Sequence, residues 1–135
     1  MIPITQTIQH DPDNNIHGNC FSAVLASLLH IPIENIPTFS DEACWLCQVN
    51  QFLQKYNLAY VQINGLKEVI QDTCITGMYH EIGGTTNRPD CLHAVVGLDG
   101  EQLFDPHPTR LGLKEIVSYG VFIVLDPSKM SIGVI

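Results

Sequence analysis

The chain has 135 residues, of which 45% are hydrophobic and 15% charged, a composition typical of a globular protein. Its length suits one domain with a substantial core, so we take residues 1–135 as a single domain. Acidic side chains outnumber basic ones by 14 to 6, giving a formal net charge of −8 with His neutral. A binder of nucleic-acid phosphates or of an acidic membrane surface is therefore not expected, whereas charge complementarity favours a basic substrate or partner.

Membrane and export signals are missing from the sequence pattern. No apolar run reaches the ~20 residues that a transmembrane helix needs. The first six residues have neither a basic start nor a long apolar stretch, so no secretory signal peptide is predicted. The five cysteines are an odd number, so at least one is unpaired. These features predict a cytoplasmic protein with free thiols.

The N-terminal part predicts a polar loop followed by a buried helix. Residues 7–19 are rich in turn-forming side chains, and residues 20–30 are nearly all apolar or small. A helix that is apolar on all sides is a buried helix. Asn19 is a favoured N-cap residue directly before this helix, and Pro32 ends it, because the residue before a proline avoids the helical region.

The middle of the chain predicts a second helix, a strand and a third, short helix. Ser40 and the two acids after it have the pattern of a helix start. The apolar face of this helix has spacings of three and four and consists of Trp45, Val49, Phe52, Leu53 and Tyr56. A strand at 60–63 and an Asn-Gly turn precede a short helix at 67–72.

The remaining segments predict strands. We expect them at 75–82, 93–98, 102–105 and 121–125, with a loop over 83–90. Helices that come first in the chain and antiparallel strands that follow indicate an α+β fold.

Cys20 is the strongest candidate for a reactive group. It is placed in the first turn of the buried helix, where the helix dipole and free backbone N–H groups stabilise a thiolate. The same N–H groups can hold a developing oxyanion. Gly18, just upstream, lets the backbone turn tightly and lets a substrate approach. The alternative interpretation is that Cys20 is a small core residue, as many cysteines are.

A base and an orienting group for this thiol are predicted from a hairpin. If its loop spans residues 98–100, Gly97 pairs with Glu101, and His93 lies directly opposite Asp105 on one face. A two-residue Asp-Gly turn would place them on opposite faces. We predict the three-residue loop, which leaves Cys20, His93 and Asp105 as nucleophile, base and orienter.

These residues carry a resemblance to a known superfamily. The Gly-Asn-Cys-Phe segment that ends at Phe21, the His-Ala-Val-Val-Gly strand that begins at His93 and the Asp-Pro pair at Asp105 resemble papain-like cysteine peptidases. The compact bacterial C39-like and NlpC/P60-like branches are closest in size and order, and the resemblance covers residues 18–125. The Gly-Asn-Cys segment is also similar to that of OTU-type deubiquitinases, which place their histidine nearer the end of a longer chain.

The resemblance implies a papain-like α+β fold in which the nucleophile helix packs on an antiparallel sheet. It implies the same roles for Cys20, His93 and Asp105, and needs no cofactor or metal. Such families place a Gln before the cysteine as an oxyanion donor. Gln6 fits if the polar loop after it is an insertion, and Asn19 is the second candidate.

Other motifs were weighed against this site. Cys44-Trp45-Leu46-Cys47 is a Cys-x-x-Cys that falls inside the predicted second helix, where packed thiols are expected rather than a redox or zinc site. His107 and Trp45 are possible cleft residues. His80 is a competing base for which no facing acid can be placed.

The predicted function is that of a cysteine hydrolase that cleaves an amide, peptide or thioester bond through an acyl-enzyme, with a peptide or protein as substrate. One alternative is a glutamine deamidase or isopeptidase that acts on a partner protein. Another is a catalytically idle domain that binds a peptide. A thiol-redox module that uses Cys44 and Cys47 would instead require a reversible disulfide between them.

Overall fold

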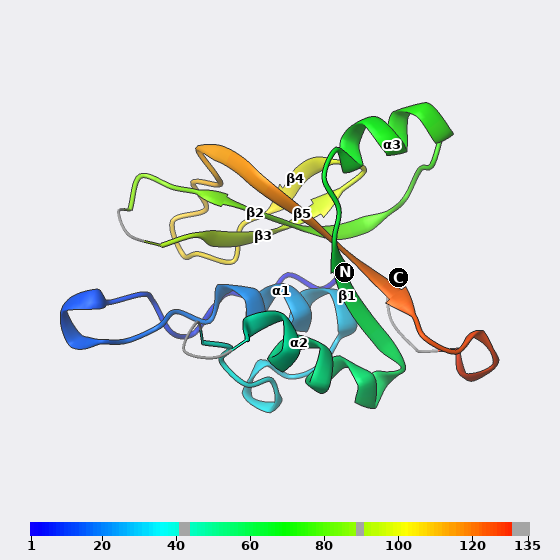
Figure 1. Cartoon of the computed structure of the whole chain (residues 1–135). Helices are drawn as coiled ribbons and strands as arrows, with labels where there is room; N and C mark the ends of the chain where they lie inside the picture. Colours follow the sequence, from blue (N-terminus) through cyan, green and yellow to red (C-terminus); the bar gives the residue numbers. More distant parts are fainter. Residues whose placement is uncertain (41–43, 89–90, 131–135) are drawn as a thin grey trace.

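The computed structural model describes residues 1–40, 44–88 and 91–130, and this part of the chain has an α+β fold (Figure 1). The helices are α1 (Cys20–Leu29), α2 (Trp45–Leu53) and α3 (Leu66–Thr73), and the strands are β1 (Leu58–Gln62), β2 (Tyr79–Thr85), β3 (His93–Leu98), β4 (Glu101–Phe104) and β5 (Glu115–Val124). The strands form one antiparallel sheet in the order β1-β5-β2-β3-β4. The predicted α+β class is confirmed.

Helices cover both faces of the sheet. Figure 1 shows α1 and α2 on one face and α3 on the other. Every residue of α1 after Cys20 is buried, which confirms the predicted buried helix. Its apolar side chains pack against Ala94 and Val96 of β3, whereas α3 packs Leu66 and Ile70 against Val121 of β5. This packing fixes the position of α1 relative to β3, the strand that begins with His93.

The second helix begins later than its sequence predicts. Cys44 is the N-cap, and its sulfur accepts the backbone N–H of Cys47 at 3.2 Å. The predicted start at Ser40 includes residues 41–43, which lie outside the described residues. The Cys-x-x-Cys therefore lies at the start of α2 rather than inside it. Cys44 and Cys47 form a disulfide, which corrects the prediction that both are free thiols.

Strand β2 continues into the segment predicted as a loop. It runs to Thr85 through Gly83 and Gly84, and β5 begins at Glu115 rather than at Val121. A side chain at Gly84 would collide with the backbone carbonyl of Glu115, so glycine permits the close pairing of β2 with β5. The glycines that suggested a loop are thus the residues that let the strand continue.

The β3–β4 hairpin has a two-residue turn, so the predicted three-residue loop is wrong. Leu98 pairs with Glu101, and the turn residues Asp99 and Gly100 have φ values of 52° and 87°. Positive φ at both central residues is the geometry of a type I′ turn, which matches the right-handed twist of two paired strands. This turn by itself places His93 and Asp105 on opposite faces.

A β-bulge brings the two side chains back to the same face. Gly97 pairs with Gln102, but the next pair is Val96 with Phe104, so Leu103 is an extra residue on β4. One extra residue reverses the alternation of side chains along the rest of the strand. The bulge therefore compensates for the shorter turn.

In the described part of the chain, no helix is long and apolar enough to cross a membrane.

Candidate active site

Cys20 is the first residue of α1 and lines a cavity. Its thiol is free and partly exposed. The backbone before it passes close to the N-terminal segment, because a Cβ at Gly18 would lie 2.9 Å from the backbone N of His10 and 3.2 Å from the O of Ile8. Gly18 thus permits a close approach, as predicted, but the group that approaches it is the N-terminal segment of the chain itself. The first backbone N–H groups of α1 have no partner inside the helix and remain available to a ligand.

His93 and Asp105 form a buried pair beside this thiol. His93 Nε2 lies 2.6 Å from Asp105 Oδ1, and the two side chains are 4% and 5% exposed. Because Nε2 is bonded to the carboxylate, Nδ1 is the ring nitrogen left for Cys20. Burial alone lowers the pKa of His93. Hydrogen bonds to Asp105 and Cys20, together with their charges, outweigh burial and raise this pKa to about 9.

Asp105 is held as a carboxylate by three donors. Besides His93, the backbone N–H of His107 donates to its Oδ1 at 2.8 Å and the backbone N–H of Gly112 to its Oδ2 at 2.7 Å. Burial acts to raise the pKa of Asp105, but these hydrogen bonds and the charge of His93 lower it to about 2. Arg110 fixes the same loop by donating to the carbonyl oxygens of Asp105 and His107. The carboxylate is therefore fixed in position and ionised above acidic pH.

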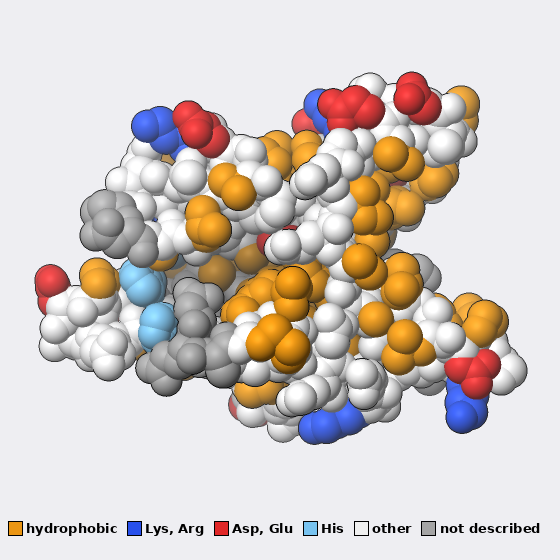
Figure 2. Space-filling model, in the orientation of Figure 1, with side chains coloured by type: hydrophobic (Ala, Val, Ile, Leu, Met, Phe, Trp, Pro, Cys, Tyr) orange, Lys and Arg blue, Asp and Glu red, His pale blue; other side chains and the backbone are white. Residues whose placement is uncertain are grey.

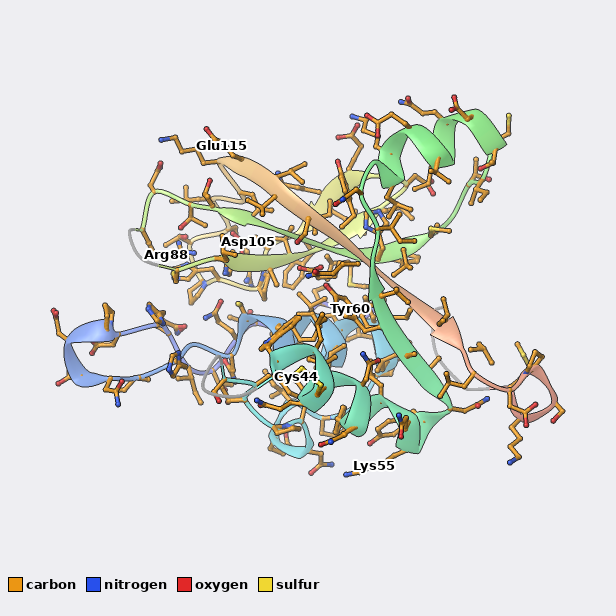
Figure 3. All side chains as sticks on the ribbon, in the orientation of Figure 1. Cys44, Lys55, Tyr60, Arg88, Asp105 and Glu115 are labelled. Carbon is orange, nitrogen blue, oxygen red and sulfur yellow. A yellow bond between two sulfur atoms is a disulfide. The ribbon has the colours of Figure 1, made fainter. Side chains whose placement is uncertain are left out.

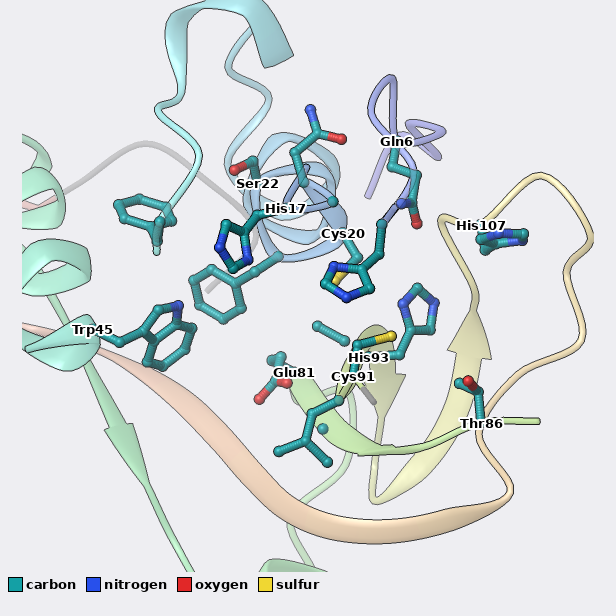
Figure 4. A pocket seen from close by; sticks show the side chains of 18 of the residues that line it. Gln6, His17, Cys20, Ser22, Trp45, Glu81, Thr86, Cys91, His93 and His107 are labelled. Atoms are coloured by element: carbon teal, nitrogen blue, oxygen red, sulfur yellow. The ribbon is translucent and has the colours of Figure 1, made fainter. Parts of the chain in front are cut away.

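The cavity lies between the helical layer and the sheet and has a volume of about 850 Å³. Figure 2 shows this hollow in the surface, and Figure 3 shows Tyr60 between the two layers. Cys20 and His93 face the cavity together, with Trp45 and His107 toward its two ends (Figure 4). Both predicted cleft residues thus line it. The ring of Trp45 is fixed by an edge contact with Phe21, at 4.8 Å between centroids.

Gln6 also lines the cavity, although 14 positions separate it from Cys20. Its backbone N–H donates to Pro106 O at 2.9 Å, which attaches the N-terminal segment beside Asp105. The intervening residues form a loop that is closed by an antiparallel β-bridge between Asp11 and Ile16. The side-chain Nε2 of Gln6 donates to Ile8 O at 2.9 Å, whereas its buried Oε1 has no partner among the described residues. The unpartnered atom is thus an acceptor, whereas the donor Nε2 carries one further N–H besides the one that bonds Ile8 O.

Asn19, the second predicted oxyanion residue, is used differently. Its Oδ1 accepts the backbone N–H groups of Thr7 and Ile8 at 3.1 and 2.9 Å, and its Nδ2 donates to Thr7 Oγ1 at 2.9 Å. Its side chain also makes no cap hydrogen bond to α1. These contacts hold the segment that carries Gln6, so we assign Asn19 to positioning and leave Gln6 as the oxyanion candidate.

A buried carboxyl in the cavity wall was missed by the sequence analysis. Glu81 is 3% exposed and accepts a hydrogen bond from Tyr60 Oη at 2.8 Å. Burial raises the pKa of Glu81 to about 7, and the hydrogen bond from Tyr60 opposes this shift in part. The available signal was a carboxylate in the middle of an otherwise uncharged strand.

His80 has a structural role. It is fully buried, its Nε2 accepts the backbone N–H of Gly100 at 2.9 Å, and its Nδ1 lies 3.1 Å from Glu81 O. These contacts fix the neutral tautomer with the proton on Nδ1. Burial lowers the pKa of His80, in keeping with a neutral ring. Both ring nitrogens are engaged with backbone groups, Nε2 with Gly100 of the hairpin and Nδ1 with Glu81 of β2, so His93 remains the base candidate.

Among the other cysteines and histidines, His10, His17 and Cys91 also line the cavity. The residues that line the cavity do not include the Cys44–Cys47 disulfide. Within residues 1–40, 44–88 and 91–130, no group of three or more His, Cys, Asp or Glu is arranged to hold a metal ion.

Comparison of the chain with protein-family models, with curated proteins and with solved structures finds no significant match. The functional argument therefore depends on the geometry of the cavity.

Proposed function

We propose that this protein is a cysteine hydrolase of papain-like type that cleaves an amide or peptide bond through an acyl-enzyme. One observation carries the proposal. A partly exposed thiol at a helix start and an imidazole line one cavity, and a buried carboxylate is hydrogen-bonded to that imidazole, although the three groups come from distant parts of the chain. The packing of α1 on the antiparallel sheet supports a papain-like arrangement.

In the proposed reaction His93 takes the Cys20 thiol proton on Nδ1, which gives a thiolate–imidazolium pair, and the thiolate sulfur then attacks the carbonyl carbon of the substrate as the carbonyl π electrons move to oxygen. The imidazolium donates this proton to the leaving amine as the C–N bond breaks. Asp105 accepts the Nε2–H bond, which fixes the tautomer and stabilises the imidazolium. Water then attacks the thioester, with His93 as base, and releases the acid product and the Cys20 thiol.

The negative oxygen of the tetrahedral intermediate needs hydrogen-bond donors. The backbone N–H groups at the start of α1 supply one set. The Gln6 side chain supplies the second, because its amide carries a further N–H besides the one that bonds Ile8. Asn19 contributes by holding this segment against the helix start.

A peptide segment suits this cavity better than a single amide side chain. A volume of about 850 Å³ lies at the upper end of the range for small-molecule sites, roughly 300–1,000 Å³, and exceeds what one Gln side chain fills. The cavity therefore favours a peptidase over a glutamine deamidase or an isopeptidase that reads one side chain.

Thiol reactivity tests the proposal. Cys20 should react with iodoacetamide at neutral pH faster than Cys74, which is exposed and free and serves as an internal control. A dipeptidyl acyloxymethyl ketone should label Cys20 alone, and His93→Ala should slow this labelling about 10²-fold or more. Peptide mapping by mass spectrometry measures both reactions.

Cys20→Ala is the control that identifies the labelled atom, and Cys74→Ala should leave the labelling unchanged. Equal labelling of the parent and His93→Ala, or a Cys20 no more reactive than Cys74, would refute the proposal. Peptide binding that persists in Cys20→Ala while the parent cleaves nothing would indicate the catalytically idle binding domain instead.

A further inference from the structure

Glu81 occupies an unusual position in the wall of the cavity. It lies on β2 with its side chain toward α1 and α2, opposite Gly120 of β5. A carboxyl group that is 3% exposed loses most of its hydration, and such groups normally find partners for both oxygens. Glu81 has a partner for one of them.

The two carboxyl oxygens have different surroundings. Oε2 accepts the hydrogen bond from Tyr60 Oη, and Gln62 Nε2 lies within 3.4 Å of that same hydroxyl. No described residue donates to Oε1, and the carboxyl faces the cavity (Figure 4). The fixed oxygen thus orients the carboxyl, and the second oxygen is left to accept a hydrogen bond from a ligand.

Two glycines create the space around this carboxyl. A Cβ at Gly83 would lie 3.1 Å from Glu81 Oε1 and 2.7 Å from Ser118 Oγ. A Cβ at Gly120 would collide with the ring and hydroxyl of Tyr60, so glycine there lets the tyrosine reach across β5 to Glu81. Any larger residue at Gly83 would fill the space in front of Oε1. The wall is therefore open at the oxygen that has no partner.

We propose that Glu81 determines substrate specificity by binding a cationic side chain, Lys or Arg, of the peptide or protein that Cys20 attacks. This inference rests on the proposed function and names the substrate class of the same cavity. A guanidinium or ammonium group supplies N–H donors and the charge that a buried carboxylate lacks. The net charge of −8 favours the approach of such a substrate.

A cation fits this place better than a neutral amide does. Burial keeps the pKa of Glu81 near neutrality, and a bound cation stabilises its ionised form. A neutral amide offers no such compensation for an ionised, buried carboxylate. Arg88 and four histidines also line the cavity, and one of these, His93, is paired with Asp105, which is not among the lining residues. Glu81 is the acidic residue among the described residues of the lining. Glu81 is thus the acid that a substrate cation can neutralise.

Paired probes test the inference. Dipeptidyl acyloxymethyl ketones carry Arg or its neutral isostere citrulline at either position on the acyl side. At one of the two positions, the Arg probe should label Cys20 about tenfold faster than the citrulline probe, because a charge-assisted hydrogen bond is exchanged for a neutral one. Intact-protein mass spectrometry gives the second-order rate constants.

In Glu81→Gln the ratio of the Arg rate to the citrulline rate should fall to about one. Glu34→Gln is the matched control, because it removes one negative charge from an exposed residue outside the cavity. If Glu81→Gln does not fold, the Gly83→Ala/Ser118→Ala variant places a methyl group in front of Oε1 without a change of charge and should also lose the preference.

The outcomes separate this inference from the proposed function. Labelling of Cys20 at equal rates by the Arg and citrulline probes at both positions overturns the role of Glu81 and leaves the hydrolase proposal standing. An Arg preference that persists in Glu81→Gln also overturns the role of Glu81 and leaves the hydrolase proposal standing. A Cys20 that no probe and no iodoacetamide modifies removes both proposals together.

Discussion

At the scale of single residues, the charge state of His93 controls the proposed chemistry. Its pKa of about 9 favours the imidazolium at neutral pH, the form in which His93 holds the proton taken from Cys20. Hydrolysis of a peptide amide should therefore decline as pH rises through about 9, because the proton for the leaving amine is lost. The pH dependence of peptide hydrolysis measures this alkaline limb.

Asp105 should determine the pH at which this alkaline decline occurs. Asp105→Asn removes the charge that raises the pKa of His93 and leaves the burial that lowers it, so the alkaline limb should move to lower pH. Asp13→Asn, an exposed loop variant, controls for the lost charge. An unchanged limb in Asp105→Asn would contradict the assignment of Asp105 as the orienter.

Gln6 should affect acyl chemistry without affecting thiol activation. Loss of one oxyanion donor typically lowers a rate about 10²- to 10³-fold, and we expect Gln6→Ala to slow amide hydrolysis by about that factor. Alkylation of Cys20 by iodoacetamide forms no oxyanion, so its rate should stay within about twofold of the parent. A parallel fall in both rates would show that Gln6 supports the fold of the site rather than the intermediate.

At the scale of elements, the β3–β4 hairpin combines a wrong turn prediction with a correct convergence of side chains. The turn is fixed by contacts from another strand segment: Asp99 accepts the backbone N–H groups of Gly77 and Met78, and His80 accepts that of Gly100. Neither contact is local in sequence. The bulge at Leu103 likewise depends on how β4 pairs with β3, and no local sequence pattern predicted it.

His80 should therefore stabilise the hairpin without taking part in the reaction. Loss of its hydrogen bond to Gly100 in His80→Ala should lower the free energy of unfolding by roughly 1–3 kcal/mol. At a temperature where the variant is folded, Cys20 labelling should match the parent. Urea denaturation and labelling kinetics measure the two effects. A 10²-fold loss of labelling would mean that His80, rather than His93, is the base.

At the scale of the whole molecule, three buried groups make stability depend on pH. The pKa of Glu81 is raised from 4.5 to about 7 and that of His93 from 6.5 to about 9, so each stabilises the fold at low pH and loses that contribution as pH rises through its folded value. The pKa of Asp105 is lowered from 3.8 to about 2, so its contribution is lost only as pH falls through that range.

The urea concentration at the midpoint of unfolding should consequently decrease as pH rises from 5 to 9. Glu81→Gln should remove the part of this decline that lies between about pH 4.5 and 7 and leave the part toward pH 9, which belongs to His93. Glu34→Gln serves again as the surface control. A midpoint that rises steadily over this range would show that other groups dominate the pH dependence.

The sequence by itself determined the buried helix α1 and the α+β class, because these follow from local composition and from the periodicity of apolar residues. It also offered Cys20, His93 and Asp105 as candidates, although the hairpin register that paired His93 with Asp105 is wrong. Tertiary structure decided how the candidates meet. A bulge turned Asp105 toward His93, and Asn19 fixed the returning loop that brings Gln6 to the helix start. Strand pairing also revealed Glu81 as part of the cavity wall. Pairing register and loop closure depend on contacts between residues far apart in the chain, which local patterns do not encode.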